Sequence, residues 1–152
     1  MNDETLEMAN ALSGKITLPA KDPEGKYIKK IGNFAGIYET ASVSVPYGNN
    51  ITHIFFEPNS QYEEVLDSAF ICNIGNPRKL LGIYLPETIK KIGNRAFLWN
   101  SLLKHVFNAD GDWRNTQLEF IGQFAFKSIS GQLIVTHLPS SLKTIENKAF
   151  EE

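Results

Sequence analysis

Three aromatic residues at matching places in the sequence are the first candidates for chemistry, and that chemistry is recognition of a partner. Phe55, Tyr84 and Phe107 lie in three runs that align as strands: Ile51 to Phe56, Leu80 to Leu85, and Leu103 to Asn108. Side chains alternate between the faces of a strand, so the alignment predicts one outward-facing column of three rings. Contiguous exposed aromatic side chains are typical of interaction sites. A register different by one residue would instead place them in the core.

The three histidines extend this candidate surface. His53 and His105 fall with Gly82 in the neighbouring outward column, and His137 falls in the aromatic column of the last unit. Imidazole is a common metal ligand, but these histidines lack the close spacing of a metal site. We therefore assign all three to a partner-binding face and predict no metal ion and no other cofactor.

Nucleophilic and acidic residues form no catalytic pattern. Cys72 is the only cysteine, and a nucleophile needs a base and an orienting group beside it, so core packing is the better interpretation. Asp110 and Asp112 are spaced like the start of a calcium loop, but the glycine is misplaced and no glutamate stands at the twelfth position. Neither phosphate-binding glycine motif occurs. The sequence predicts a protein that is not an enzyme.

The elements that must position these residues are repeats. The string LPETIKKIGNRAF, residues 85–97, matches LPSSLKTIENKAF, residues 138–150, without a gap. Shorter echoes end in Ala-Phe at Phe70 and Phe126, and the most altered one ends at Gly36. About five units of uneven length therefore cover residues 15–150. One such unit cannot bury its own apolar face, so we expect stacked coils in a solenoid.

Each recurring residue has an expected place in the coil. Paired apolar residues three positions apart should face inward, with Ile92, Ile121 and Ile145 lining a common interior, and Ala-Phe should fill the space between units. Three recurring glycines should adopt a turn conformation closed to larger residues: Gly32, Gly93 and Gly122. Five lysines should be solvated charge on the opposite, convex face: Lys29, Lys30, Lys90, Lys91 and Lys143.

Composition excludes several classes of function. The chain has 152 residues with a net charge of −2 and no long basic run, so nothing predicts binding to nucleic acid. Residues 1–14 predict a short helix that caps the first coil. They are acidic where a secretory signal would be basic, and no window is long and apolar enough for membrane insertion. Localisation is left open by these residues.

The recurring string Leu-Pro-x-x-Ile/Leu-x-x-Ile-Gly/Glu-Asn-x-Ala-Phe resembles the BspA-type leucine-rich repeat of bacterial surface proteins and of some protist proteins. The resemblance covers roughly residues 15–150. It implies an α/β solenoid, a right-handed coil with a parallel β-sheet on the concave side and short strands, turns and helices on the convex side. It also implies a non-enzymatic role in adhesion or partner recognition, at a cell surface or after secretion.

Two functions remain open. The first is a binding module whose concave face, with the three aromatics and three histidines, holds a protein or glycan partner. The second is a structural fragment of a longer array, which stacks end to end or forms a homo-oligomer through its last repeat because that repeat has no polar cap.

Overall fold

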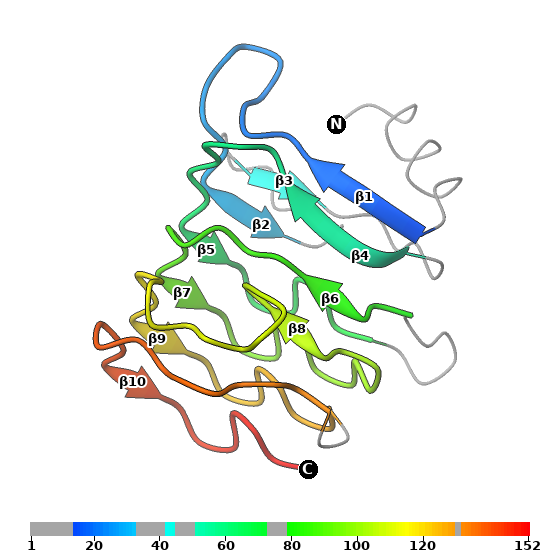
Figure 1. Cartoon of the computed structure of the whole chain (residues 1–152), viewed down its shortest axis with the longest axis vertical. Coiled ribbons are helices and arrows are strands. Elements are labelled where there is room, and N and C mark those ends of the chain that lie inside the picture. Colours follow the sequence, from blue (N-terminus) through cyan, green and yellow to red (C-terminus); the bar gives the residue numbers. More distant parts are fainter. Residues whose placement is uncertain (1–13, 33–41, 45–50, 73–78, 130–131) are drawn as a thin grey trace.

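The computed structural model describes residues 14–32, 42–44, 51–72, 79–129 and 132–152. The predicted N-terminal cap helix and Gly36 lie outside these residues. Short parallel strands stack from one end of the molecule to the other (Figure 1), as coils of a solenoid do. The strands are β1 (Gly14–Leu18), β2 (Lys30–Gly32), β3 (Ser42–Ser44), β4 (Ile51–Phe56), β5 (Glu64–Val65), β6 (Gly82–Ile83), β7 (Lys91–Ile92), β8 (His105–Val106), β9 (Phe120–Ile121) and β10 (Thr144–Ile145).

These strands form two parallel sheets. The first sheet has the order β1-β4-β6-β8, and the second has the order β10-β9-β7-β5-β2-β3. Successive coils contribute neighbouring strands to each sheet, so the described chain rises by about one strand spacing, ~4.8 Å, per coil. The described residues contain strands and turns but no helix, so the helices expected on the convex side are not found there. None of their segments forms a helix that could span a bilayer.

The three-apart apolar pairs build the core beneath the second sheet. Ile31, Val65, Ile92 and Ile121 align in register from strand to strand and are completely buried. The first members of the same pairs are also buried: Ile28, Tyr62, Ile89 and Leu118. The interior predicted from the repeat is therefore confirmed for these coils.

The final coil departs from that prediction. Ile145 pairs in register with Ile121, yet 47% of its surface is exposed, because no further coil of the described chain lies over it. Phe150 is likewise 42% exposed on its outer side. The apolar interior is thus open at the C-terminal end of the stack.

Ala-Phe forms the third side of each coil. Four phenylalanine rings stack with centroids 5.1, 5.3 and 5.2 Å apart and nearly parallel planes: Phe70, Phe97, Phe126 and Phe150. The amide of each of the first three donates to the carbonyl of the next coil's alanine. The residue before each alanine has a positive φ between 56° and 59°: Ser68, Arg95, Phe124 and Lys148. This left-handed residue turns the chain into the Ala-Phe side.

The recurring glycines are needed for a different reason from the one predicted. Gly93 and Gly122 do not have positive φ; instead the backbone of the preceding coil leaves them no room. A Cβ at Gly93 would lie 2.6 Å from the amide nitrogen of Asp67, and one at Gly122 would lie 2.6 Å from that of Asn94. Gly32 is less tight, since a Cβ there would meet only the side chain of Leu66 at 3.1 Å.

Candidate partner-binding face

The outer surface of the first sheet is assembled by strand register. Ile54 pairs with Ile83, which pairs with Val106, and all three point into the core. The residues before them, His53, Gly82 and His105, therefore form one outward column, as predicted. On the neighbouring strand, Lys15 pairs with His53 and Thr17 pairs with Phe55.

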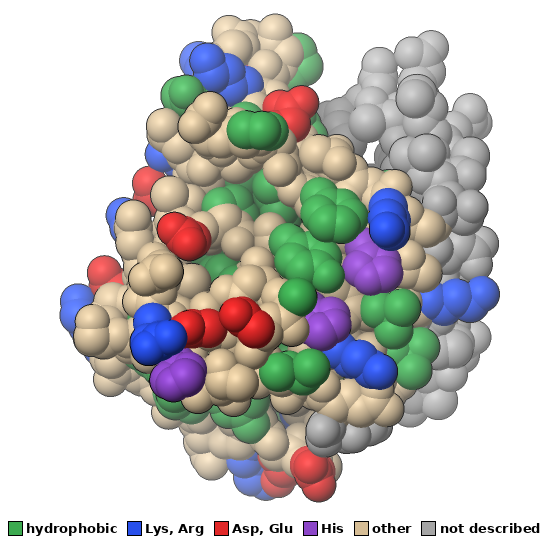
Figure 2. Space-filling view, in the orientation of Figure 1, with side chains coloured by type: hydrophobic (Ala, Val, Ile, Leu, Met, Phe, Trp, Pro, Cys, Tyr) green, Lys and Arg blue, Asp and Glu red, His purple; other side chains and the backbone are tan. Residues whose placement is uncertain are grey.

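Four rings of this surface lie parallel to one another. The centroids of Phe55 and Tyr84 are 4.9 Å apart, with planes only 6° from parallel, so two of the three predicted column members meet as expected. Tyr84 also stacks with His53 at 6.4 Å and with His105 at 6.5 Å. We call these four rings and Gly82 the ring face. Figure 2 shows its hydrophobic and histidine side chains side by side in the middle of the molecule.

Gly82 gives the rings their space. A Cβ at this position would lie 3.2 Å from the Tyr84 ring and 3.3 Å from that of His53. The Tyr84 ring thus leans across the glycine and lies between the rings of β4 and that of His105. Tyr84 therefore has rings close to it from both neighbouring strands.

Phe107 is not part of this face. Its side chain is 7% exposed and belongs to the core. The strand alternation ends at Val106, since Phe107 has a φ of 72° and this left-handed conformation turns its ring inward. The ring packs on the indole of Trp113 at 5.2 Å. The prediction of a third exposed column member is therefore wrong.

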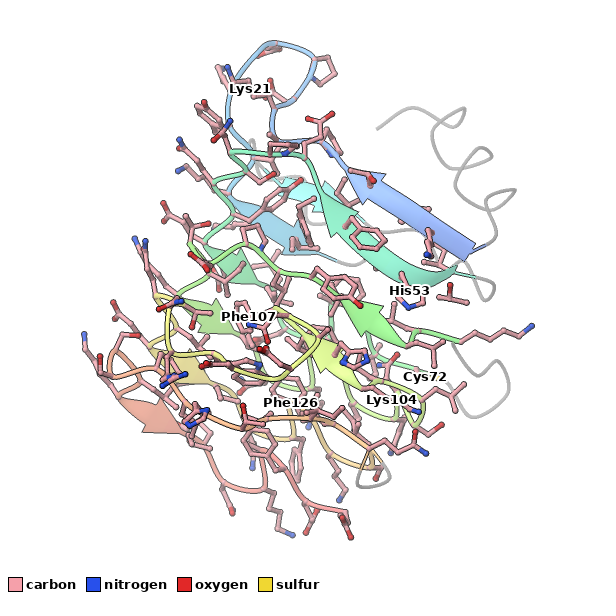
Figure 3. The ribbon with its side chains drawn as sticks, in the orientation of Figure 1. Lys21, His53, Cys72, Lys104, Phe107 and Phe126 are labelled. Atoms are coloured by element: carbon pink, nitrogen blue, oxygen red, sulfur yellow. The ribbon has the colours of Figure 1, made fainter. Side chains whose placement is uncertain are left out.

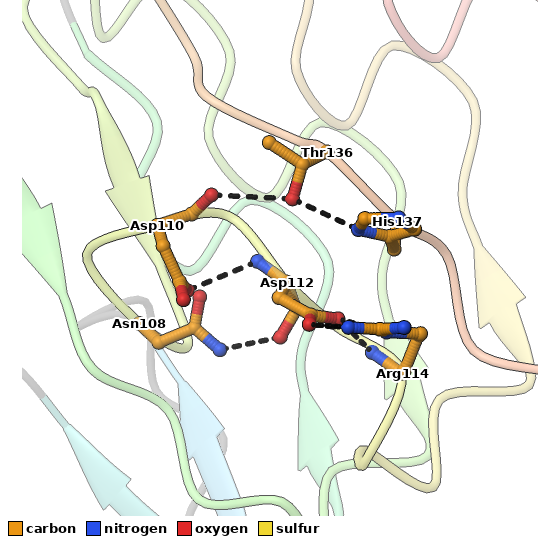
Figure 4. A network of polar contacts seen from close by, with 6 residues as sticks. All are labelled: Asn108, Asp110, Asp112, Arg114, Thr136 and His137. Atoms are coloured by element: carbon orange, nitrogen blue, oxygen red, sulfur yellow. Dashed lines mark hydrogen bonds and ion pairs between the residues drawn. The ribbon is translucent and has the colours of Figure 1, made fainter.

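His137 is exposed but lies elsewhere on the same side of the molecule. Its backbone pairs with Asp112, because the loop after Phe107 displaces the last coil from the register of β8. Figure 4 shows it in a polar network: Nδ1 meets Thr136 Oγ1 at 3.2 Å, and Arg114 Nε donates to Asp112 Oδ1 at 2.9 Å. The structure thus separates His137 from the column of Phe55 and Tyr84.

The polar network is a surface turn, as the sequence indicates. Asp110 Oδ1 accepts the amide of Asp112 at 3.2 Å, and Asn108 Nδ2 donates to the carbonyl of Asp112 at 2.5 Å. The pKa of Asp112 is lowered to about 2, above all by hydrogen bonds from the side chain and backbone of Arg114. These carboxylates are already occupied by donors of the same loop.

The electrostatics of the ring face favour the neutral form of His53. Partial burial lowers the pKa of His53 below its ordinary value of 6.5, and the positive charges of Lys15 and His105 lower it further. Its Nδ1 lies 3.0 Å from Thr52 Oγ1, whereas Nδ1 of His105 is buried without a hydrogen-bond partner. The Nδ1 atom of His53 is thus paired within the protein, and that of His105 is closed off from solvent.

The outer surface of the second sheet is different, because its charges are paired across coils. Glu63 lies 3.1 Å from the ammonium of Lys29 and 3.7 Å from that of Lys90. Lys91 pairs with Glu64 at 2.8 Å, and Lys143 with Glu119 at 3.0 Å. These lysines are solvent-facing charge, as expected, and their partners come from the protein itself.

Sequence reasoning missed Lys15 and Lys104 as members of the surface. Both are exposed, Lys15 beside His53 on β1 and Lys104 directly before His105. Figure 3 labels His53 on β4 and Lys104 just before β8, the two strands of the first sheet that lie on either side of β6. Aligning β1 with β4 at the sequence level would have found Lys15. Among the described residues, no group of three or more metal-ligating side chains occurs, and Cys72 is buried.

Parallel sheets of short strands, with a repeated Ala-Phe side, define a repeat solenoid. The chain belongs to the BspA-type leucine-rich repeat family: the family model described as "BspA type Leucine rich repeat region" matches residues 47–152 in six copies. This family consists of interaction repeats, so the chain is a repeat module of that kind. No curated protein and no solved structure matches it.

Proposed function

We propose that this protein is a non-catalytic interaction module that binds a protein or glycan partner on the ring face, the side that the family resemblance makes concave. Adhesion or recognition of a host or partner, at a cell surface or after secretion, is the setting in which such a module would act. Phe55, Tyr84, His53 and His105 are the residues that we assign to binding.

One contrast carries the proposal. The second sheet presents ion pairs that the protein satisfies internally, between Glu63 and Lys29 for example. The first sheet presents the stacked rings of Phe55 and Tyr84, with the rings of two histidines beside them. Interfaces are enriched in aromatic side chains, so the ring face has the composition expected at the centre of a binding surface.

The test compares matched variants of the two sheets. Phe55→Ala with Tyr84→Ala should abolish capture of a partner from a cell or host extract, while Lys29→Ala with Lys90→Ala should leave it unchanged. Circular dichroism should show that both double variants remain folded. Equal capture by all three proteins would exclude the ring face as the binding site.

A second function is supported by the open end of the stack. Apolar side chains there surround a cavity of about 350 Å³: Phe126, Ile129, Leu133, Val135, Leu138 and Phe150. Inside the molecule, equivalent rings are covered by the next coil. We infer that a further coil or a second copy of the chain could cover this end, so that the protein would act as a structural repeat.

Sedimentation velocity tests this alternative directly. Ile145→Lys with Phe150→Glu should dissociate an end-stacked oligomer without changing the ring face. A wild-type protein that sediments as a monomer at all accessible concentrations would exclude self-association through this end.

A further inference from the structure

We propose that the partner of the ring face is an acidic peptide segment of another protein, whose carboxylates lie along a basic flank of Lys15, His53, His105 and Lys104. This inference rests on the proposed function, because it names the partner of the same surface. It commits to a protein ligand with negative charge and excludes a glycan.

The basic flank follows from the register of the first sheet. Lys15 is opposite His53 on the adjacent strand, and Lys104 precedes His105. In Figure 2 each of the two central histidine patches has a patch of Lys or Arg beside it. Positive charge is therefore arranged along one side of the rings, where the strands begin.

These charges have no partner within the described chain. Neither Lys15 nor Lys104 lies in an ion pair there, whereas lysines of the second sheet pair with Glu63, Glu64 and Glu119. An interface gains specificity and association rate when its potential meets the opposite potential on the partner. An acidic segment would supply the carboxylates that the first sheet lacks.

The electrostatics of His53 agree with this arrangement. The like charges of Lys15 and His105 help to lower the pKa of His53. A carboxylate placed over the flank would oppose this effect, since an opposite charge favours the protonated imidazole. Binding of the partner should therefore be accompanied by uptake of protons from solution at His53.

Negative charge of the protein itself sets the orientation. Asp110 and Asp112 lie in the loop that follows Phe107, at the other end of β8 from Lys104. Asp112 is held by Arg114, and Asp110 is exposed. Like charges repel, so the acidic part of a partner should lie toward Lys15 and Lys104 and away from this loop.

The stacking of the rings favours a peptide over a sugar or a nucleic-acid base. Bases stack on the exposed faces of aromatic side chains, and flat contact with a sugar also needs a free ring face. Here the Tyr84 ring has Phe55 on one side at 4.9 Å and His105 on the other at 6.5 Å. The edges of aromatic rings carry partial positive charge, which suits carboxylates.

Selection from a library of random short peptides displayed on phage tests the proposal with the full chain. We expect peptides rich in Asp and Glu beside aliphatic residues, all of which fail to bind Tyr84→Ala. The double variant Lys15→Glu with Lys104→Glu should bind the selected peptides about tenfold more weakly or worse. The matched control, Lys21→Glu with Lys26→Glu, has the same change of charge in an exposed loop and should bind as the wild type does.

Three results would overturn the acidic-peptide proposal. Selected peptides could need Tyr84 but carry no acidic surplus, or acidic peptides could bind both charge-reversed proteins equally well. Alternatively, a glycan array or single-stranded DNA could yield the only ligands that depend on Lys15 and Lys104. The first result would leave the ring face intact as a binding site. Ligands that bind Phe55→Ala with Tyr84→Ala as well as wild type would instead refute the proposed function itself.

Discussion

The ring of Phe107 packs edge-on against the indole of Trp113, with centroids 5.2 Å apart and planes inclined by 64°. Trp113 is completely buried. This contact fixes the inner side of the loop that interrupts the first sheet after β8. It also removes from the surface a ring that the strand pattern would otherwise have placed beside Tyr84.

Truncating Phe107 should therefore cost stability. We expect Phe107→Ala to lower the free energy of unfolding by about 3–5 kcal/mol, because a large core side chain is lost and a cavity is left against Trp113. Phe55→Ala, at a half-buried surface position, should cost less than about 1.5 kcal/mol. Urea unfolding followed by tryptophan fluorescence measures both. Similar losses for the two variants would contradict the assignment of one to the core and the other to the surface.

The glycine at the end of β9 should tolerate no side chain. In Gly122→Ala the new methyl group would lie 2.6 Å from the amide nitrogen of Asn94, and backbone cannot move aside as a side chain can. We expect a loss of about 2–3 kcal/mol in the free energy of unfolding. Gly32→Ala is the matched control, since its methyl would meet only the end of Leu66 at 3.1 Å. A loss in Gly32→Ala as large as that in Gly122→Ala would argue against close approach of the coils as the cause.

Glycine in place of the left-handed residue before Ala-Phe should stabilise the protein. Arg95 has a φ of 56°, a conformation that costs a residue with a Cβ about 1–2 kcal/mol. Glycine avoids this cost but loses about 0.5–1 kcal/mol of chain entropy on folding. Arg95→Gly should therefore raise the free energy of unfolding by about 0.5–1 kcal/mol. Gln117→Gly, at an exposed position without positive φ, should lower it, and thermal unfolding of both variants gives the comparison.

The repeat pattern predicted most of the fold because each coil solves the same packing problem. Val65, Ile92 and Ile121 had to face inward for any unit to be stable, and their spacing gave the register of the second sheet. The alignment of His53, Gly82 and His105 followed in the same way.

What the sequence could not give depends on single backbone conformations and on neighbours from other coils. Nothing in the strand pattern indicates that Phe107 takes a φ of 72° and leaves the outward column. The displacement of His137 to Asp112 follows from that loop. The role of Gly122 likewise depends on how closely Asn94 approaches, which spacing along the chain does not express.

The ring face should make stability depend on pH near neutrality. The folded-state pKa of His53 lies below 6.5 because partial burial, then Lys15 and His105, disfavour the cation. The unfolded chain therefore binds more protons between the two pKa values, and the free energy of unfolding should fall as pH drops through 6.5. Above 6.5 this contribution of His53 is constant.

The variant Lys15→Gln removes one of the repelling charges, so its free energy of unfolding should fall less steeply than that of the wild type over the same pH range. Lys26→Gln, in an exposed loop, serves as the control and should keep the wild-type slope. Urea unfolding at a series of pH values measures these slopes, and identical slopes for wild type and Lys15→Gln would show that Lys15 does not act on His53.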